Sequence, residues 1–213
     1  MKVIAINGSP RKDGNTSIVL KTVLKGLENQ GIEGELIHIG AAGIRGCTAC
    51  GMCAKNHDKK CVLKDQGVDV NEIIQKMIDA DGHLLGAPVH YAGIAGTMKS
   101  FLDRSYYVAG SNGRLFRHKV GAGIVSLRRS GGSVAIDQIN KYFQISEMLM
   151  PAANYWNIVH GMKEGEAVND LEGMQIAGVL GKNMAWLLKM IEHSRGTVEV
   201  PTKEDKIAMN FVR

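Results

Sequence analysis

Aromatic residues, prolines and cysteines are all scarce in this chain. Phe, Trp and Tyr make up 5% of its 213 residues, and there are 4 Pro and 4 Cys against 26 Gly. So few aromatics argue against an aromatic-rich β-sandwich and favour a fold with tight strand-to-helix turns. With 45% hydrophobic residues the chain can bury one sizeable core, and we expect one domain.

Long hydrophobic runs are also missing, because no apolar stretch reaches the length of a membrane-spanning helix. The apolar start, residues 1–6, is too short for a signal peptide and is followed at once by the polar sequence 7–10. We therefore expect a cytoplasmic protein with no membrane partner. In that reducing compartment, cysteine thiols stay available to metals instead of pairing as disulfides.

Acidic residues are the minority charge, with 21 Asp and Glu against 26 Lys and Arg and a net charge of +5. A positive field mildly favours anionic ligands or acidic partners, because it raises their encounter rate. The basic residues are dispersed, and aromatic residues do not alternate with them as they do in strand-binding surfaces. We expect no nucleic-acid partner.

Short β-rich runs alternate with longer helical patterns, which is typical of a parallel sheet covered by helices on both faces. The first helix, for example, has apolar residues at helical spacing and Gly31 at the position of a C-terminal cap. We expect strands at 2–6, 35–39, 82–87, 120–126 and 157–160, and helices at 16–30, 70–80, 95–106, 134–149 and 171–191.

Two segments fall outside this alternation. Residues 40–67, after the second strand, are too long for a plain connection and should be functional. Residues 196–213 lose the helical period and carry Pro201 among charged residues. We expect a domain over residues 1–195, followed by a tail that is either loose or an arm packed on another subunit.

All four cysteines fall in the 40–67 insertion, at Cys47, Cys50, Cys53 and Cys61, with the spacing C-x2-C-x2-C-x7-C. Two-residue gaps in a glycine-containing loop allow three sulfurs to face a common centre, and the fourth closes the set. Four thiolates suit a [4Fe–4S] cluster or a tetrahedral zinc ion. The triple CxxCxxC favours the cluster, since zinc sites usually have two separated pairs. Thiols that bind no metal or that sense redox state remain an alternative.

The loop after the first strand, residues 7–17, has the composition of an anion site. Ser9, Asn15, Thr16 and Ser17 supply hydroxyl, amide and backbone donors at the positive end of a helix dipole. Neither G-x-G-x-x-G nor G-K-[ST] occurs here, so a dinucleotide or triphosphate loop is disfavoured and a terminal monophosphate is favoured. The alternative is an ordinary strand-to-helix turn with a Ser/Thr cap.

Two further loops follow the third and fourth strands and should reach the same edge of the sheet, where ligands of open parallel sheets bind. The first, within residues 86–96, offers glycine turns flanked by His90 and Tyr91 to a planar heteroaromatic ring. Tyr91 could equally be a packed surface aromatic. The second, residues 126–132, is a flexible polar loop that contains Arg128 and Arg129.

These motifs together resemble a known family. The opening G-S-P-R-x-x-G-N-T at residues 8–16, the block from Gly86 to Arg104 and the late Gly-Gly loop are similar to the flavodoxin-like NAD(P)H-dependent FMN reductases. The cysteine segment resembles that of the iron–sulfur flavoproteins within this family. The resemblance reaches to about residue 160 and implies a doubly wound, five-stranded parallel sheet of order 2-1-3-4-5.

The resemblance also implies two cofactors, FMN and a [4Fe–4S] cluster on the four cysteines. The FMN phosphate would bind Ser9, Arg11, Asn15, Thr16 and Ser17, the flavin ring would bind Pro88, Val89, His90, Tyr91 and Gly93, and Ser126 and Arg128 complete the cofactor-binding candidates. It further implies a homodimer or homotetramer with each cluster near a flavin. Two departures from the family pattern are the long gap before Cys61 and the Arg128–Arg129 pair in a loop that is often glycine-rich.

The expected function is electron transfer between a two-electron donor, NAD(P)H, and one-electron acceptors. FMN accepts electrons in pairs and releases them singly, whereas a cluster passes one at a time. Ferredoxin is an alternative donor, and a ferredoxin or a small molecule would be the acceptor. We assign no catalytic acid or nucleophile. The alternatives are a cluster-free FMN or quinone reductase, a flavodoxin-like electron carrier without turnover, and a zinc-stabilised interaction module.

Overall fold

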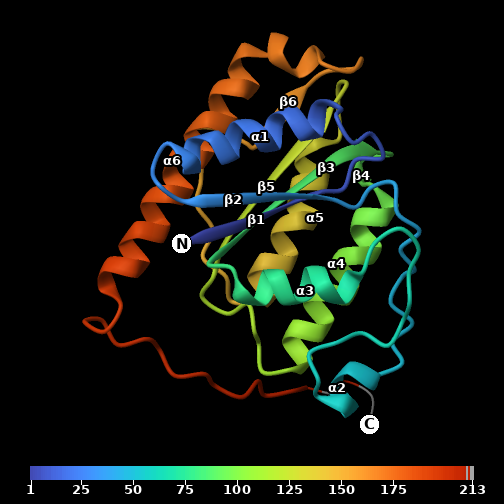
Figure 1. Ribbon diagram of the computed structural model, residues 1–213, viewed down its shortest axis with the longest axis vertical. Coiled ribbons are helices and arrows are strands. Elements are labelled where there is room, and N and C mark those ends of the chain that lie inside the picture. Colours follow the sequence, from blue (N-terminus) through green and yellow to red (C-terminus); the bar gives the residue numbers. More distant parts are fainter. Residues whose placement is uncertain (210, 212–213) are drawn as a thin grey trace.

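A central parallel sheet organises the chain, as a computed structural model shows for residues 1–209 and 211 (Figure 1). Its strands are β1 (Lys2–Asn7), β2 (Glu33–His38), β3 (Gly82–His90), β5 (Val120–Leu127) and β6 (Ile158–His160). They pair in the order β2-β1-β3-β5-β6, and every pair is parallel. This confirms the expected doubly wound sheet, with the five parallel strands in the expected spatial order.

The sheet has one addition that sequence patterns did not predict. β4 (Gly93–Ile94) folds back antiparallel onto the end of β3, pairing Val89 with Ile94 and His90 with Gly93. A two-residue strand is too short to leave a periodic signal. Its effect is to extend β3 to His90, three residues beyond the expected end at position 87.

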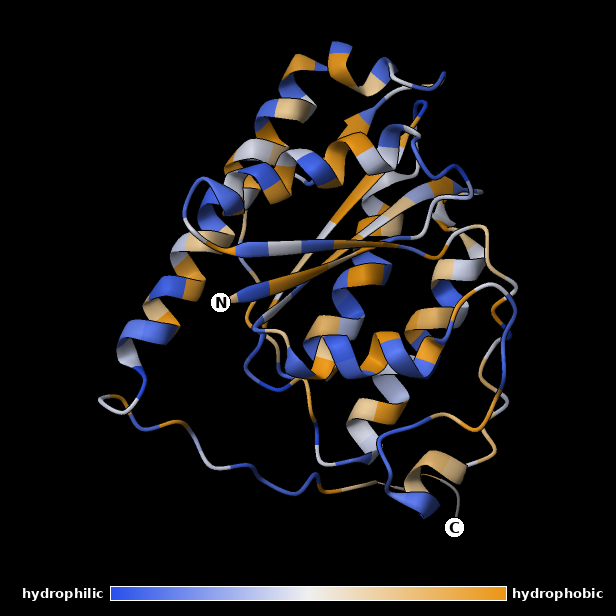
Figure 2. Ribbon diagram, in the orientation of Figure 1, coloured by the Kyte–Doolittle hydropathy of each residue, from blue (hydrophilic) through white to orange (hydrophobic). Residues whose placement is uncertain are grey.

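Helices cover both faces of the sheet. α1 (Asn15–Glu28) and α6 (Leu171–Ser194) share one face, and α3 (Val70–Asp79), α4 (Gly96–Ser111) and α5 (Gly132–Ile145) share the other (Figure 1). Each face has its own core, and the orange strands in Figure 2 lie between them. α1 and α6 cross closely at two glycines, since a Cβ on Gly26 would lie 3.1 Å from the Gly181 Cα.

Two expected helix ends differ from the structure by four or five residues, for physical reasons. α5 ends at Ile145 and not at residue 149, because the chain turns at Glu147 (φ 54°) and Leu149 pairs beside the start of β5. α4 continues to Ser111 and not to residue 106, because Val108 and Ala109 extend its buried stripe. The first helix ends at Glu28, two residues before its expected end, and Gly31 lies in the left-handed region at φ 76°.

Two short helices complete the chain: α2 (Met52–Asn56), inside the cysteine insertion, and the 3-10 helix η1 (Glu166–Asn169) before α6. After α6, residues 196–209 and 211 form neither helix nor strand. The Arg117 guanidinium donates to the Pro201 carbonyl at 2.8 Å and so ties this segment to the domain. The expected tail of residues 196–213 includes 210, 212 and 213, which lie outside the described residues. No helix among the described residues is long and apolar enough to cross a membrane.

Among the described residues, one histidine is buried in the core. His83, on β3, is 0% exposed, contacts Phe116 edge-on at 4.5 Å, and has its Nε2 2.9 Å from the Met77 carbonyl. Its Nδ1 has no hydrogen-bond partner among the described residues. Burial lowers the pKa of His83 from 6.5 to about 4, so the folded protein keeps this ring neutral.

We predict that His83 makes stability depend on pH between these two values. Between pH 6.5 and about pH 4, the unfolded chain binds a proton at His83 and the folded chain does not. The free energy of unfolding therefore falls as the pH is lowered through this window. The loss amounts to about 3 kcal/mol. His83→Gln should remove this component in urea titrations at pH 4–6.5, with His193→Gln, an exposed site, as control. Parallel profiles for wild type and His83→Gln would contradict the assignment.

Candidate functional site

The first candidate loop, residues 8–14, connects β1 to α1 and is fixed by backbone contacts. The Gly8 N–H donates to the Gly86 carbonyl at 2.8 Å, and the Ser9 N–H donates to Asn7 Oδ1 at 3.0 Å. A Cβ on Gly40 would lie 1.9 Å from the Ser9 carbonyl oxygen, so only glycine allows the chain after β2 to approach this closely. The loop is therefore held between the ends of three neighbouring strands, β2, β1 and β3.

This loop leaves the start of α1 open to an anion. Gly14 is the N-cap and provides no side-chain acceptor, and the first turn contains no acidic residue. The N–H groups of Ser17 and Ile18 bond to the Gly14 carbonyl, which leaves those of Asn15 and Thr16 unused by the helix. Free N–H groups at a helix N-terminus are a favourable environment for a phosphate.

The side chains around this terminus have different partners. Thr16 Oγ1 lies 2.6 Å from Ser126 Oγ, which joins the start of α1 to the end of β5. The Asn15 carboxamide donates to the Lys163 carbonyl at 2.9 Å and accepts from the Ala167 N–H at 3.1 Å. Ser17 Oγ is buried and has no hydrogen-bond partner among the described residues, so the protein fold leaves this hydroxyl unsatisfied.

The second loop is a tight hairpin between β3 and β4. Its two turn residues, Tyr91 (φ 48°) and Ala92 (φ 60°), both lie in the left-handed region that such turns require and that glycine or asparagine usually supplies. Tyr91 is fully exposed, so packing does not explain its place in this strained turn. Strain of this kind is concentrated at ligand sites.

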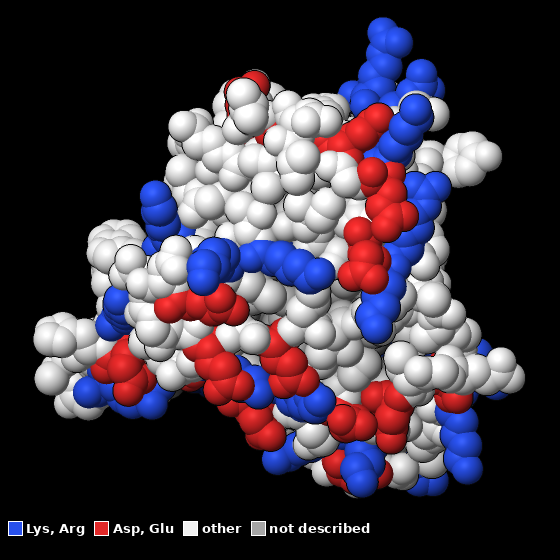
Figure 3. Space-filling model, turned by 45° about the horizontal axis from the view of Figure 1, so that its top comes forward, with Lys and Arg blue, Asp and Glu red and all other residues white. Residues whose placement is uncertain are grey.

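The third loop, residues 128–131, packs directly against the hairpin. A Cβ on Gly131 would lie 2.7 Å from the Ala92 Cα, so the two loops touch. Arg128 and Arg129 are exposed and form no ion pair with any described residue. Figure 3 shows Lys and Arg side chains along the right-hand edge of the molecule, with Asp and Glu side chains directly beside them. The three-loop edge of the sheet combines open N–H groups with the positive charge of Arg128 and Arg129.

The cysteines form a second feature, near α2 and the second half of α4. All four line one small cavity of about 20 Å³, together with Arg104, Tyr107 and Val108 of α4. Cys47 and Cys50 are exposed, Cys61 is half-buried and Cys53 is buried. Among the described residues, no three His, Cys, Asp or Glu side chains already lie at the spacing of a single metal ion.

Asparagines fix the backbone that carries these thiols. Asn71, at the start of α3, accepts from the Cys61 N–H at 2.8 Å and donates to the Cys61 carbonyl at 2.9 Å. Asn112, just after α4, donates to the Cys53 carbonyl at 3.2 Å and accepts from the Lys59 N–H at 2.9 Å. Two core helices thus hold two of the four cysteines in place.

The thiols differ in acidity. The Met52 N–H, at the start of α2, donates to the Cys50 sulfur and lowers the pKa of that thiol. Burial raises the pKa of the Cys53 thiol. Of these two thiols, Cys50 is therefore the readier thiolate.

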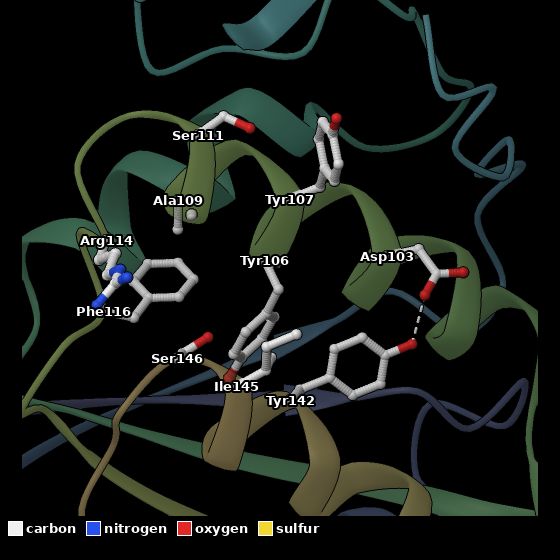
Figure 4. Close-up of a pocket in the computed structure, with 11 residues that line it drawn as sticks. Asp103, Tyr106, Tyr107, Ala109, Ser111, Arg114, Phe116, Tyr142, Ile145 and Ser146 are labelled. Atoms are coloured by element: carbon white, nitrogen blue, oxygen red, sulfur yellow. Dashed lines mark hydrogen bonds between the residues drawn. The ribbon is translucent and has the colours of Figure 1, made fainter. Parts of the chain in front are cut away.

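A separate hollow of about 370 Å³ lies between α4 and α5 (Figure 4). Its walls include Tyr106 and Phe116, and Tyr142 donates to Asp103 at 2.5 Å across one side. Burial raises the pKa of Tyr142 to about 12, so the hydroxyl stays protonated. The hollow offers mainly apolar walls, without the glycine-rich backbone of the sheet edge, and we place the candidate site at that edge.

The structure brings the sequence-derived candidates together in two groups. Ser9, Arg11, Asn15, Thr16, Ser17 and Ser126 surround the first loop, Pro88, Val89, His90, Tyr91 and Gly93 form the hairpin, and Arg128 lies beside it. The four cysteines form the other group. Sequence analysis missed Asn71, Asn112 and the contacts of Arg104. A charged residue on the buried stripe of α4, beside Phe101 and Ser105, was the available signal for Arg104.

Comparison with known proteins gives a consistent result. The model of the NADPH-dependent FMN reductase family matches residues 1–163. An iron–sulfur flavoprotein of Methanocaldococcus jannaschii is 37% identical over 199 residues, which cover 90% of this chain and 100% of that protein. Another iron–sulfur flavoprotein, from Methanosarcina thermophila, is 32% identical over 197 residues, which cover 92% of this chain and 99% of that protein.

Solved structures support the fold. RosB, solved with bound 8-demethyl-8-formylriboflavin-5'-phosphate, superposes with a TM-score of 0.71 at 12% identity, covering 100% of this chain and 94% of RosB. An archaeal flavodoxin superposes with a TM-score of 0.57 at 17% identity, covering 89% of this chain and 99% of the flavodoxin. The family match spans all three loops and the four cysteines, and the relatives match over nearly their whole length. The chain therefore belongs to the NADPH-dependent FMN reductase family, in its iron–sulfur flavoprotein branch, and is a flavin oxidoreductase.

Proposed function

We propose that the protein holds FMN at the three-loop edge and a [4Fe–4S] cluster on its four cysteines, and that it converts two-electron reduction into one-electron transfer. The observation that carries the proposal is that the only four thiols of the chain line one cavity, in a chain whose sheet edge separately fits a flavin phosphate. FMN would supply hydride acceptance, and the cluster would supply single-electron transfer.

The residues present fit FMN. The open N–H groups of Asn15 and Thr16 and the unpartnered Ser17 hydroxyl suit a phosphate, and exposed Arg11 adds positive charge. The hairpin offers exposed backbone and the Tyr91 ring to a planar isoalloxazine. Asn15 would act mainly through its N–H, because its carboxamide already anchors residues 163 and 167.

The residues also fit a cluster. A cubane bonds each thiolate to a different iron and so spreads its four sulfurs wider than a single tetrahedral ion does. Four thiols around one cavity, held by Asn71 and Asn112, match this need. Because Cys47 and Cys50 are exposed, a cluster here would face outward, which supports electron exchange with the flavin of a neighbouring subunit in a homodimer or homotetramer.

The chain's own residues position the cofactors and tune them. The bond between Thr16 and Ser126 fixes the first loop against β5, and the strained hairpin holds its backbone toward the ligand edge. Exposed Arg128 and Arg129 are placed to attract an anionic donor, either NAD(P)H or an acidic ferredoxin. We propose no side chain as an acid or nucleophile, since electron transfer requires neither.

Ser17→Ala should separate ligand binding from folding. Loss of one hydrogen bond to a charged phosphate costs about 1.5–3 kcal/mol, so the FMN dissociation constant should rise about tenfold or more. The stability of the apoprotein should stay the same or increase, because the buried hydroxyl has no protein partner. Thr16→Ala should lower both the FMN affinity and the stability of the apoprotein, since it leaves Ser126 Oγ unpaired. Calorimetric titration and thermal denaturation measure the two effects.

The control for this experiment is Thr22→Ala, later on the same helix, where the hydroxyl bonds only to the Ile18 carbonyl. It should leave FMN affinity unchanged. Unaltered FMN affinity after changing Thr16 and Ser17 together would show that the phosphate binds elsewhere.

Replacing Arg128 and Arg129 by Gln together should slow flavin reduction by the donor and flatten its dependence on salt. Steering of an anionic donor is screened over about 8–10 Å at physiological ionic strength. Stopped-flow reduction at low and high salt measures the effect. Lys25→Gln with Lys182→Gln removes the same charge from the outer face of α1 and α6 and is the matched control. Identical salt profiles for both double variants would leave the arginines without this role.

Cys50→Ala should remove iron and acid-labile sulfide but leave FMN bound, because the phosphate loop lies on a different strand-to-helix connection. Metal analysis and absorption spectra of anaerobically purified protein distinguish the alternatives. Flavin bands with a broad cluster shoulder support the converter, flavin alone supports a cluster-free reductase, and zinc supports an interaction module. Fewer than about two irons per wild-type chain would overturn the cluster proposal.

A further inference from the structure

Arg104 is the most deeply buried cation that contacts the cysteine insertion. It lies on α4, and its side chain is 0% exposed, a burial that is costly unless each guanidinium nitrogen has a hydrogen-bond partner. Nε donates to the Cys61 sulfur at 3.3 Å, and Nη2 donates to the Leu63 carbonyl at 2.9 Å. Nη1 donates to Asp65 at 2.5 Å and to the Arg45 carbonyl at 3.2 Å.

These contacts join both ends of the cysteine segment to one helix. Arg45 precedes the first cysteine, and Leu63 and Asp65 follow the last one. Asp65 also accepts a hydrogen bond from the Arg45 N–H at 3.1 Å, so the Arg104–Asp65 pair holds the two ends of the cysteine segment together. The Asp65 side chain is only 2% exposed, which makes this a buried ion pair.

A buried ion pair is a costly way to close a loop. Desolvation of the two charges offsets most of their attraction, and apolar side chains of similar size would often hold the segment as well or better. Closure alone therefore does not explain an arginine here. The contact that an apolar residue could not provide is the N–H directed at Cys61 sulfur, one of the four thiols of the cavity.

We propose that Arg104 is a positioning residue that orients Cys61 and raises the reduction potential of the cluster held there. This inference rests on the proposed function, because it assumes a cluster on the four cysteines. Among the described residues that line the cavity, Arg104 is the only cation. A cation and an N–H donor at a ligating sulfur stabilise the more negative, reduced form, and low local polarity strengthens the effect.

The redox step itself is simple. One electron from the reduced flavin, or from an added reductant such as dithionite, would enter the cluster, and no bond would form or break and no proton would be transferred. The charge of the site becomes more negative by one, and the fixed charge of Arg104 compensates for part of this change. Asp65 opposes it, because its carboxylate neutralises part of the guanidinium charge. The two partners should therefore shift the potential in opposite directions.

The test uses the full-length protein, purified anaerobically and reconstituted, with dithionite as reductant. Midpoint potentials come from redox titration followed by electron paramagnetic resonance, and iron and sulfide contents are measured on the same samples. Arg104→Gln should lower the midpoint potential, and Asp65→Asn should raise it. Arg104→Lys keeps the charge but loses the planar set of guanidinium donors. Its shift in midpoint potential should therefore have the same sign as that of Arg104→Gln and be smaller. Lys99→Gln, an exposed cation earlier on α4, should change nothing.

Opposite shifts are what distinguishes this proposal from a merely structural role. If Arg104 and Asp65 only closed the loop, both variants would lose iron or shift the potential in the same direction, and either result would overturn the inference. Should Arg104→Gln fail to load a cluster, Arg104→Lys and Asp65→Asn decide the question, and unchanged potentials in both would also overturn it. A wild-type protein that binds no iron would refute the proposed function itself, whereas a loaded wild type with unresponsive variants refutes only the role of Arg104.

Discussion

Parallel pairing of β1, β3 and β5 is the constraint on which both sites depend. Because the strands run in one direction, the loops after β1, β3 and β5 all emerge at the same edge, although they are separated by up to 120 residues. Burial of the central strands on both faces fixes this register, since a slip by one residue would exchange the two apolar cores. The hydroxyl contact between Thr16 and Ser126 is then a consequence of the sheet and not of either loop alone.

Much of this arrangement could be predicted from local sequence patterns. Apolar periodicity located the five parallel strands and five of the helices, because the strands and helices repeat at different intervals. The cysteine spacing and the glycine-rich loops are likewise short-range signals. The resemblance to a family added the strand order, which periodicity alone does not determine. The failures are the short elements β4, α2 and η1 and the ends of some helices, as at Ile145, where a contact between Leu149 and β5 decides where the helix stops.

Residues that support the cysteines were beyond prediction for a different reason. Asn71 lies in the first turn of α3 and Asn112 directly after α4, and an asparagine near a helix end usually indicates a cap. Their actual partners, the backbones of Cys61 and Cys53, lie 10 and 59 residues away. Only the fold brings α3 and the end of α4 to the insertion. A residue whose role is to satisfy one backbone carbonyl leaves no periodic or compositional trace in the sequence.

α4 connects the two sites mechanically. It begins directly after the hairpin strand β4, and its second half carries Arg104, Tyr107 and Val108 along the cysteine cavity. Gly96 and Arg104 are eight residues apart, which corresponds to roughly 12 Å along a helix axis. A rigid, buried helix of this kind fixes the distance between the hairpin and the thiols more reliably than the long insertion could. Placing the anchors of the insertion on α4 makes the sheet, and not the loop, the structural reference for both sites.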